Sequence, residues 1–229
     1  MSVFGSLQKT FVGTFFRKLL RAEIINPGNE PADNNIAYVA CINHSSMWDP
    51  ILIGACMHRP LRYMAKAELF KIPVLKSIVK LFGAFPVNRE AADVSSVKTT
   101  ISILEQGEVV GMYPQGRRAK KIHPETVTPK SGVAMVAYKA KTGILPVSVI
   151  TKGYKVRLFR KTIVVFGEYI SFEELKKIEE TLKSEKDGGN INSMELYKKI
   201  TDRVYGEILE NYRKYDNLNK AKKAEKLND

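Results

Sequence analysis

Residues 36–50 read IAYVACINHSSMWDP, and this stretch decides both the fold and the position of the chemistry. Its first seven residues are all apolar, which predicts a strand buried on both faces. His44 and Asp49 follow in a short polar segment. A histidine at a strand exit beside a carboxylate suits general-base catalysis, because the carboxylate holds the imidazole in the tautomer whose other nitrogen accepts a proton. No serine or cysteine nucleophile is needed if the substrate brings its own hydroxyl.

The spacing of His44 and Asp49 requires a loop between them. Positions five apart on an α-helix point about 140° apart, so the two side chains cannot meet on a regular helix. Pro50 disfavours helical backbone at Asp49 but suits a first helical turn, which predicts a helix from Pro50 with Asp49 near its cap. The loop before it can then fold the imidazole onto the carboxylate. The alternative is that Asp49 only caps the helix and His44 is an ordinary loop residue.

Length and charge limit the possible classes of protein. A chain of 229 residues can bury one substantial core, and one α/β domain with helical additions is the simplest interpretation. The net charge of +13 favours a polyanionic partner, such as nucleic acid, an anionic bilayer or a phosphorylated substrate. Cys41 and Cys56 have apolar neighbours and no CxxC spacing, so we expect core residues rather than a disulfide or metal pair. We expect an intracellular protein without a spanning helix.

The N-terminus has the pattern of a helix that lies in a membrane interface. Apolar residues recur at helical spacing over residues 3–20, and cations occur there without an acidic residue before Glu23. The side chains that we assign to membrane contact are Phe4, Phe11, Phe15, Phe16, Arg17 and Lys18. The alternative is an ordinary amphipathic helix that packs on the domain.

Strand and helix patterns alternate along the rest of the chain. We predict helices near residues 50–57, 73–82, 93–106, 131–141, 171–184 and 193–214, and strands near 36–42, 61–65, 109–113 and 144–150. Two further strands of hairpin character are predicted near 154–159 and 162–168. This alternation predicts an α/β fold with a mixed, largely parallel sheet flanked by helices. The expected organisation is an N-terminal membrane-associating segment (1–30), an α/β domain (31–215) and a frayed basic tail (216–229).

Further polar residues follow predicted strands. Arg89 follows Pro86, and a guanidinium there suits a bidentate grip on phosphate. Arg117 and Arg118 come directly after Gly116, whose backbone can approach an anion closely. Arg89 could instead cap a helix, and the basic loop could be only solvated or contact lipid headgroups.

These stretches, in this order, resemble the glycerolipid acyltransferases, and most closely the bacterial 1-acylglycerol-3-phosphate acyltransferases. The four stretches that carry the resemblance are Asn43-His44 with Asp49, Lys66–Phe70 through Arg89, Tyr113–Arg118, and Leu145–Val147. The resemblance covers roughly residues 35–170. It implies that His44 and Asp49 are catalytic, and that the acceptor's phosphate is held by Arg89, Gly116 and Arg118 with Lys66 and Arg117. Supporting positions would be Asn43, Glu68, Pro86, Gln115 and Pro146.

The third stretch departs from the family pattern at two positions. Gln115 stands where most members have glutamate, and Arg117 where they have threonine. Glutamine keeps hydrogen-bonding capacity but loses the charge, so an acid, base or charge-pairing role at this position is in question. A catalytically degraded family member is therefore one hypothesis.

The resemblance implies acyl transfer from a thioester of acyl carrier protein or coenzyme A to the free sn-2 hydroxyl of lysophosphatidate, giving phosphatidate for phospholipid biosynthesis. A thioester is already activated, so we expect no metal and no other cofactor. The expected place is the cytoplasmic face of the membrane, as a peripheral protein on an anionic surface. Alternatives are acylation of glycerol 3-phosphate or another lysolipid, or a non-catalytic basic module for anionic lipid or nucleic acid. Interleaved aromatics for base stacking are not evident, so no nucleic-acid partner is expected.

Overall fold

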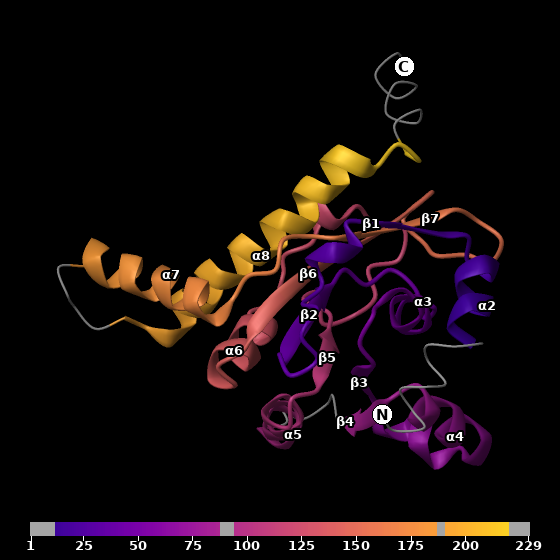
Figure 1. The fold of residues 1–229 in the computed structure, drawn as a ribbon, viewed down its shortest axis with the longest axis horizontal. Helices are drawn as coiled ribbons and strands as arrows, with labels where there is room; N and C mark the ends of the chain where they lie inside the picture. Colours follow the sequence, from indigo (N-terminus) through magenta and orange to yellow (C-terminus); the bar gives the residue numbers. More distant parts are fainter. Residues whose placement is uncertain (1–11, 88–93, 187–190, 220–229) are drawn as a thin grey trace.

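A computed structural model describes residues 12–87, 94–186 and 191–219 (Figure 1). Three of the residues assigned above, Phe4, Phe11 and Arg89, lie outside these ranges, and their roles stay predictions.

The centre of the fold is a seven-stranded sheet in the order β1-β7-β6-β2-β5-β3-β4. All neighbouring strands are parallel except β6 and β7, which are antiparallel. The strands are β1 (Ala22–Ile25), β2 (Tyr38–Ile42), β3 (Leu61–Lys66), β4 (Ala84–Val87), β5 (Val109–Met112), β6 (Gly143–Thr151) and β7 (Thr162–Phe166). The prediction of a mixed, largely parallel sheet is confirmed.

Helices cover both faces of this sheet (Figure 1). Side chains of α5 (Val94–Glu105), α6 (Gly132–Lys139), α7 (Phe172–Glu185) and α8 (Ser193–Tyr215) pack into the cluster on one face. The other face packs against α3 (Asp49–Cys56) and the end of α2 (Val12–Leu19). The remaining elements are α4 (Pro73–Leu81) and the short 3₁₀-helices η1 (Pro27–Asn29), η2 (Ala67–Lys71) and η3 (Pro124–Thr126).

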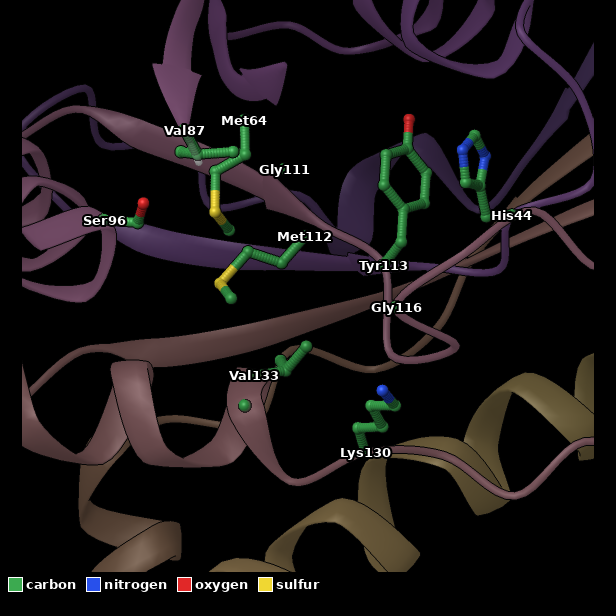
Figure 2. Close-up of a pocket in the computed structure, with 11 residues that line it drawn as sticks. His44, Met64, Val87, Ser96, Gly111, Met112, Tyr113, Gly116, Lys130 and Val133 are labelled. Carbon is green, nitrogen blue, oxygen red and sulfur yellow. The ribbon is translucent and has the colours of Figure 1, made fainter. Parts of the chain in front are cut away.

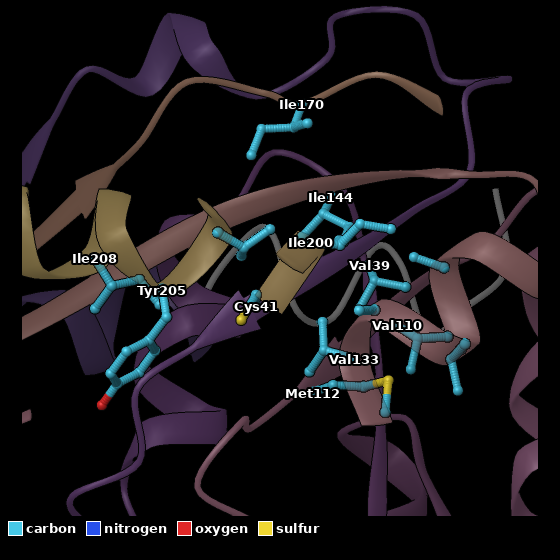
Figure 3. Packing of buried hydrophobic residues seen from close by; sticks show 14 of the residues in the cluster. Val39, Cys41, Val110, Met112, Val133, Ile144, Ile170, Ile200, Tyr205 and Ile208 are labelled. Atoms are coloured by element: carbon cyan, nitrogen blue, oxygen red, sulfur yellow. The ribbon is translucent and has the colours of Figure 1, made fainter. Parts of the chain in front are cut away.

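Strand β2 shows why its sequence must be apolar throughout. Val39 and Cys41 belong to the cluster under α6 and α8, whereas Tyr38, Ala40 and Ile42 belong to the cluster under α3. Figure 3 shows Val39 and Cys41 among side chains from the neighbouring strands and helices. Successive residues of a strand point to opposite faces, so a strand covered on both sides has no position for a polar side chain.

The connection between β6 and β7 differs from the prediction. No strand forms near residues 154–159; this described part of the chain consists of turns, and Tyr154 and Phe159 have positive φ angles of 54° and 59°. Left-handed residues interrupt an extended backbone, so the apolar residues of this segment cannot continue a ladder. The predicted hairpin is wrong at its first strand and correct at its second, β7.

The first strand of the sheet was also not predicted. Strand β1 pairs in parallel with β7, with Ala22 opposite Thr162. Residues 22–25 therefore belong to the sheet, although the predicted N-terminal segment ran to residue 30. Strand β6 lies between β7 and β2, so the proline within it, Pro146, is in an interior strand and not at an edge of the sheet.

Helix α2 combines features of both readings of the N-terminus. The Phe16 ring is half-buried and packs on the domain, with its centroid 6.4 Å from those of Trp48 and Phe82, and its assignment to membrane contact stays a prediction. Phe15 is 55% exposed, and Arg17 and Lys18 are exposed as well. Among the helices of the described ranges, none has the length and apolar character needed to cross a bilayer.

Candidate active site

The polar segments predicted at strand exits meet at one edge of the sheet. Because β2, β3, β4, β5 and β6 run in the same direction, their carboxyl ends lie together, which is where sites form in such folds. His44 follows β2 and Gly116 follows β5, and both line the same cavity. The two segments therefore converge at this edge.

His44 and Asp49 are in direct contact. The distance between Nδ1 of His44 and Oδ2 of Asp49 is 2.8 Å. The histidine side chain is 12% exposed and the aspartate is fully buried. With Nδ1 donating to the carboxylate, the Nε2 atom carries the lone pair and is the nitrogen able to accept a proton. The loop between the two residues therefore brings them together as predicted.

The buried carboxylate of Asp49 also shapes the loop that carries His44. Its Oδ2 atom accepts the backbone N–H groups of Ser45 and Ser46, at 2.7 and 2.8 Å. These donors precede the helix, which begins at Asp49 rather than Pro50. The prediction that Asp49 serves as a helix cap is thus wrong, because the carboxylate binds the loop instead. Three donors on the one oxygen Oδ2 fix the orientation of the imidazole.

Asn43 anchors the start of the same loop. Its side chain accepts the backbone N–H of Val149 at 2.7 Å and donates to the carbonyl of Val149 at 3.1 Å. It also donates to the hydroxyl of Tyr212 at 3.1 Å. An amide that binds both backbone groups of one residue continues the β2–β6 pairing beyond the strand's last residue. The supporting role of Asn43 is therefore to hold the exit of β2.

Gln115 positions the backbone of His44. The Oε1 atom of this buried glutamine accepts the N–H of His44 at 2.9 Å. On the other side, the carbonyl of His44 accepts the N–H of Ala119 at 2.8 Å. The loop after β5 therefore grips His44 through both of its backbone groups. This contact needs an acceptor oxygen but no negative charge, so an amide at position 115 can make it as well as a carboxylate.

Gln115 has a second partner that suits an amide. Its side chain hydrogen-bonds Tyr205. Burial and, to a lesser extent, nearby Cys41 raise the pKa of Tyr205 to about 12, and the hydrogen bond from Gln115 opposes this rise. The Tyr205 hydroxyl donates to the carbonyl of Pro124 at 2.8 Å, so its oxygen is left to accept. The NH₂ group of glutamine supplies that donor, whereas an ionised glutamate cannot.

Gln115→Leu should therefore lower kcat and destabilise the protein by about 1–3 kcal/mol, because it leaves the N–H of His44 without its acceptor. Gln115→Glu keeps the acceptor and should retain activity within about tenfold, with a lower Tm from the strained contact to Tyr205. Initial rates and thermal unfolding of both variants test this. A leucine variant with unchanged kcat would show that the contact does not position His44.

A cavity of about 310 Å³ opens beside His44 (Figure 2). Figure 2 shows His44, Tyr113 and Lys130 at one end and the apolar side chains of Met64, Val87 and Met112 at the other. A polar end next to an apolar end is the form of site expected for an amphipathic ligand.

Tyr113 and Lys130 were not among the predicted site residues. The Tyr113 ring stacks on the His44 ring, with centroids 4.0 Å apart and planes inclined by 21°. The backbone N–H of Lys130 donates to the carbonyl of Pro114 at 2.7 Å. This bond holds Lys130 beside the loop after β5, where it lines the cavity. A Cβ on Gly116, whose φ is 68°, would lie 3.2 Å from Cδ of Lys130. Glycine is required at 116 for its left-handed backbone and for this close approach of the lysine.

The structure places the other predicted residues less directly. Lys66 ends β3 at the same edge of the sheet, and Arg117 and Arg118 follow Gly116. The side chains of these three cations are exposed. Of the described residues, those that line the cavity do not include these three cations. The supporting residues Glu68 in η2 and Pro86 in β4 are exposed, while Pro146 is buried in β6 opposite Cys41. The assigned roles of these six residues stay predictions.

Residues 23–150, more than half of the chain, match the family model described as Acyltransferase. The chain belongs to the acyltransferase family. The matched range includes every predicted site residue that follows the N-terminal helix. It also contains the whole His44 loop, the loop after β5 and the cavity between them.

Two bacterial members of this family are similar to the chain over more than half of its length. The 1-acyl-sn-glycerol-3-phosphate acyltransferase of Bacillus subtilis is 36% identical over 140 residues, which are 61% of this chain and 67% of that protein. The enzyme of the same name from Streptococcus pneumoniae is 31% identical over 147 residues, 62% of this chain and 53% of that protein. The aligned part thus spans two thirds of the first relative and about half of the second.

A solved structure shares the fold. The crystal structure of the 1-acyl-sn-glycerophosphate acyltransferase from Thermotoga maritima superposes with a TM-score of 0.59 at 22% identity. The match covers 86% of this chain and 76% of that one. It supports the α/β architecture of this acyltransferase.

Proposed function

We propose that the chain transfers an acyl group from an acyl thioester to the free sn-2 hydroxyl of a 1-acylglycerol 3-phosphate, which gives phosphatidate for phospholipid synthesis. The observation that carries the proposal is the contact between His44 and buried Asp49 at the mouth of a cavity with a polar and an apolar end. Both similar bacterial relatives are named for this reaction. A thioester is an activated acyl donor, so the proposed reaction uses no metal or further cofactor.

His44 acts as the general base in this mechanism. Its Nε2 atom takes the proton of the acceptor hydroxyl while that oxygen attacks the thioester carbonyl. Asp49 stabilises the imidazolium that forms. The carbon–sulfur bond then breaks, and the leaving thiolate takes the proton back from His44. The thiol belongs to acyl carrier protein or coenzyme A, and both of these carriers are anionic and suit a chain of net charge +13.

The two cysteines are poor candidates for an acyl-enzyme intermediate. Burial raises the pKa of the Cys41 thiol, and burial also raises that of Cys56 to about 12, against the weaker opposing effect of Arg17. A thiol must ionise to attack a thioester, and these thiols do so only at high pH. Direct transfer to the substrate hydroxyl, with His44 as base, fits the site better.

The acceptor's phosphate is proposed to bind beside the Gly116 loop. Lys130 stands next to Gly116 at the polar end of the cavity, with Arg118 and Arg117 following on the same loop. A phosphate there would place the glycerol hydroxyl toward His44 and leave the apolar end, with Met64 and Met112, for an acyl chain. Lys66 and Arg89 complete the proposed set of cations.

Lys130→Met should lower kcat/KM for lysophosphatidate by about tenfold to a hundredfold, chiefly through KM, because it removes a charge-assisted hydrogen bond to phosphate. The matched control is Lys139→Met, which changes an exposed lysine in the last turn of α6, the helix that follows Lys130, away from the cavity. Steady-state kinetics with varied acceptor measure both. An equal effect of the two variants would place the phosphate elsewhere.

The acceptor itself is tested with purified protein, one acyl thioester and a panel of acceptors, with products identified by mass. Lysophosphatidate should be acylated in preference to glycerol 3-phosphate, lysophosphatidylcholine and monoacylglycerol. Monoacylglycerol lacks only the phosphate, so comparable turnover of it would contradict a site that holds the acceptor through that group. Preferred turnover of glycerol 3-phosphate would shift the assignment to that reaction.

A further inference from the structure

We propose that the β6–β7 loop, residues 152–161, is a membrane-docking element that holds the active-site edge of the sheet against an anionic bilayer. The proposal rests on the lipid substrate of the proposed function. It concerns a segment outside the resembling stretches and outside the N-terminal helix. The antiparallel pairing of β6 with β7 places this loop at the carboxyl end of β6, the same edge as His44.

The loop presents large apolar side chains to solvent. Phe159 is 68% exposed and Leu158 is 36% exposed, at the tip of the connection. Phe159 also has a φ of 59°, in the left-handed region that bulky side chains rarely adopt. Glycine or asparagine would suit this backbone better. A phenylalanine that is both exposed and conformationally unfavourable contributes little to folding, which points to a contact made by its side chain.

The charge of the loop fits an anionic surface. Five of its ten residues are basic and none is acidic; the basic residues are Lys152, Lys155, Arg157, Arg160 and Lys161. One of them, Lys161, pairs with Glu23 at 2.6 Å. Aromatic and aliphatic side chains between cations are the composition by which peripheral segments enter the headgroup region of anionic membranes.

The loop is fixed to the segments around the active site. The N–H of Phe159 donates to the carbonyl of Leu19 at the end of α2, at 2.8 Å, and Figure 1 shows this loop beside α2. The hydroxyl of Ser46, in the His44 loop, donates to the carbonyl of Val156 at 3.4 Å. A bilayer contact through Phe159 would thus be made by a segment held rigidly to the catalytic loop.

Two further exposed apolar side chains belong to segments that contact this loop. Phe15 of α2 is 55% exposed, and Met47 of the His44 loop is 69% exposed. Helix α2 and the His44 loop each accept or donate one of the two hydrogen bonds to the β6–β7 loop described above. The two segments also pack against each other through the rings of Phe16 and Trp48. Docking through these side chains would bring the cavity to the level of the lipid headgroups, where a lysophosphatidate presents its phosphate.

The test uses the full chain and sedimentation with vesicles of phosphatidylcholine containing or lacking phosphatidylglycerol. Phe159→Gly should weaken binding to the anionic vesicles by about tenfold to a hundredfold, while Tm stays the same or rises because the left-handed backbone is relieved. The matched control is Met194→Gly, since Met194 is 63% exposed at the opposite end of α8 from this edge. It should bind vesicles like the wild type.

Unchanged vesicle binding of the Phe159→Gly and Leu158→Ser/Phe159→Ser variants would overturn the proposal. If vesicle binding were unchanged and the KM for an acyl-carrier-protein thioester rose, the loop would be assigned to that carrier and the proposal would be overturned. Acyl transfer to lysophosphatidate in detergent micelles should be the same in wild type and variants, because no residue of the tip lines the cavity. Loss of vesicle binding by a protein that forms no phosphatidate in micelles would support docking and contradict the proposed reaction.

Discussion

His44→Ala is expected to lower the rate of phosphatidate formation by about 10²–10⁴-fold, the usual contribution of a positioned general base. The effect should fall on kcat, because the imidazole acts in the transition state and the phosphate contacts lie elsewhere in the cavity. The fold should survive. Asp49 keeps its bonds from the N–H groups of Ser45 and Ser46, so its buried carboxylate is still satisfied.

Rates with lysophosphatidate and circular dichroism of the same preparation measure this effect. The control is His58→Ala, which removes an exposed side chain at the end of α3. Within the described residues, His58 contributes its backbone N–H to the fold, in a bond of 2.6 Å to Glu30. A similar loss of activity in both variants would indicate a general effect of the substitutions and not a catalytic role of His44.

Asp49→Asn is expected to reduce kcat by on the order of 10³-fold with little change of shape. An asparagine whose side-chain oxygen takes the place of Oδ2 keeps the three donors, but it carries no negative charge to stabilise the imidazolium that forms in the transition state. The fall in kcat should therefore come from the lost charge. The variant should also be less stable by about 1–3 kcal/mol, because hydrogen bonds to a buried charged acceptor become bonds to a neutral one.

Activity of the Asp49→Asn protein must be compared below its own Tm, and the control is Asp202→Asn, an exposed residue on α8 that pairs with Lys198. The control should keep full activity, since exposed i,i+4 pairs contribute little to stability. If Asp49→Asn lost stability but kept kcat, the carboxylate would serve the loop alone and not the imidazole.

Much of the site could be predicted because it depends on local sequence. Seven consecutive apolar residues before Asn43 indicated a strand buried on both faces, and β2 is the middle strand of the sheet. Helix geometry showed that His44 and Asp49 could meet only through a loop, and they do at 2.8 Å. Alternating elements indicated parallel strands, so the polar exits had to share an edge.

The parts that were missed depend on contacts between residues distant in the chain. Strand β1 has four residues, one of them Glu23, and is recognisable only through its pairing with β7. The stacking of Tyr113 on His44 joins two loops that no local pattern connects. The apolar residues of the β6–β7 loop suggested a strand. Phe159 instead has a left-handed backbone, and its N–H bonds the distant carbonyl of Leu19, which no local pattern indicates. Asp49 resembled a helix cap because the competing N–H donors of the loop cannot be seen in sequence.

Position 115 shows how a departure from a family pattern can mislead. The change from glutamate to glutamine removes a charge, and by itself this suggests impaired chemistry. The structure uses the side chain as an acceptor for the N–H of His44 and as a partner of Tyr205. Both contacts are available to an amide, so the substitution is compatible with an intact site.

The most direct measurement mixes the purified protein with an acyl thioester and lysophosphatidate, and follows both the lipid product and the intact protein by mass. Wild-type protein should form phosphatidate while its own mass stays unchanged, since the substrate hydroxyl attacks the thioester without an acyl-enzyme. His44→Ala protein should form about 10²–10⁴-fold less. Absence of phosphatidate from the wild type, or undiminished formation by His44→Ala, would contradict His44-catalysed transfer to lysophosphatidate.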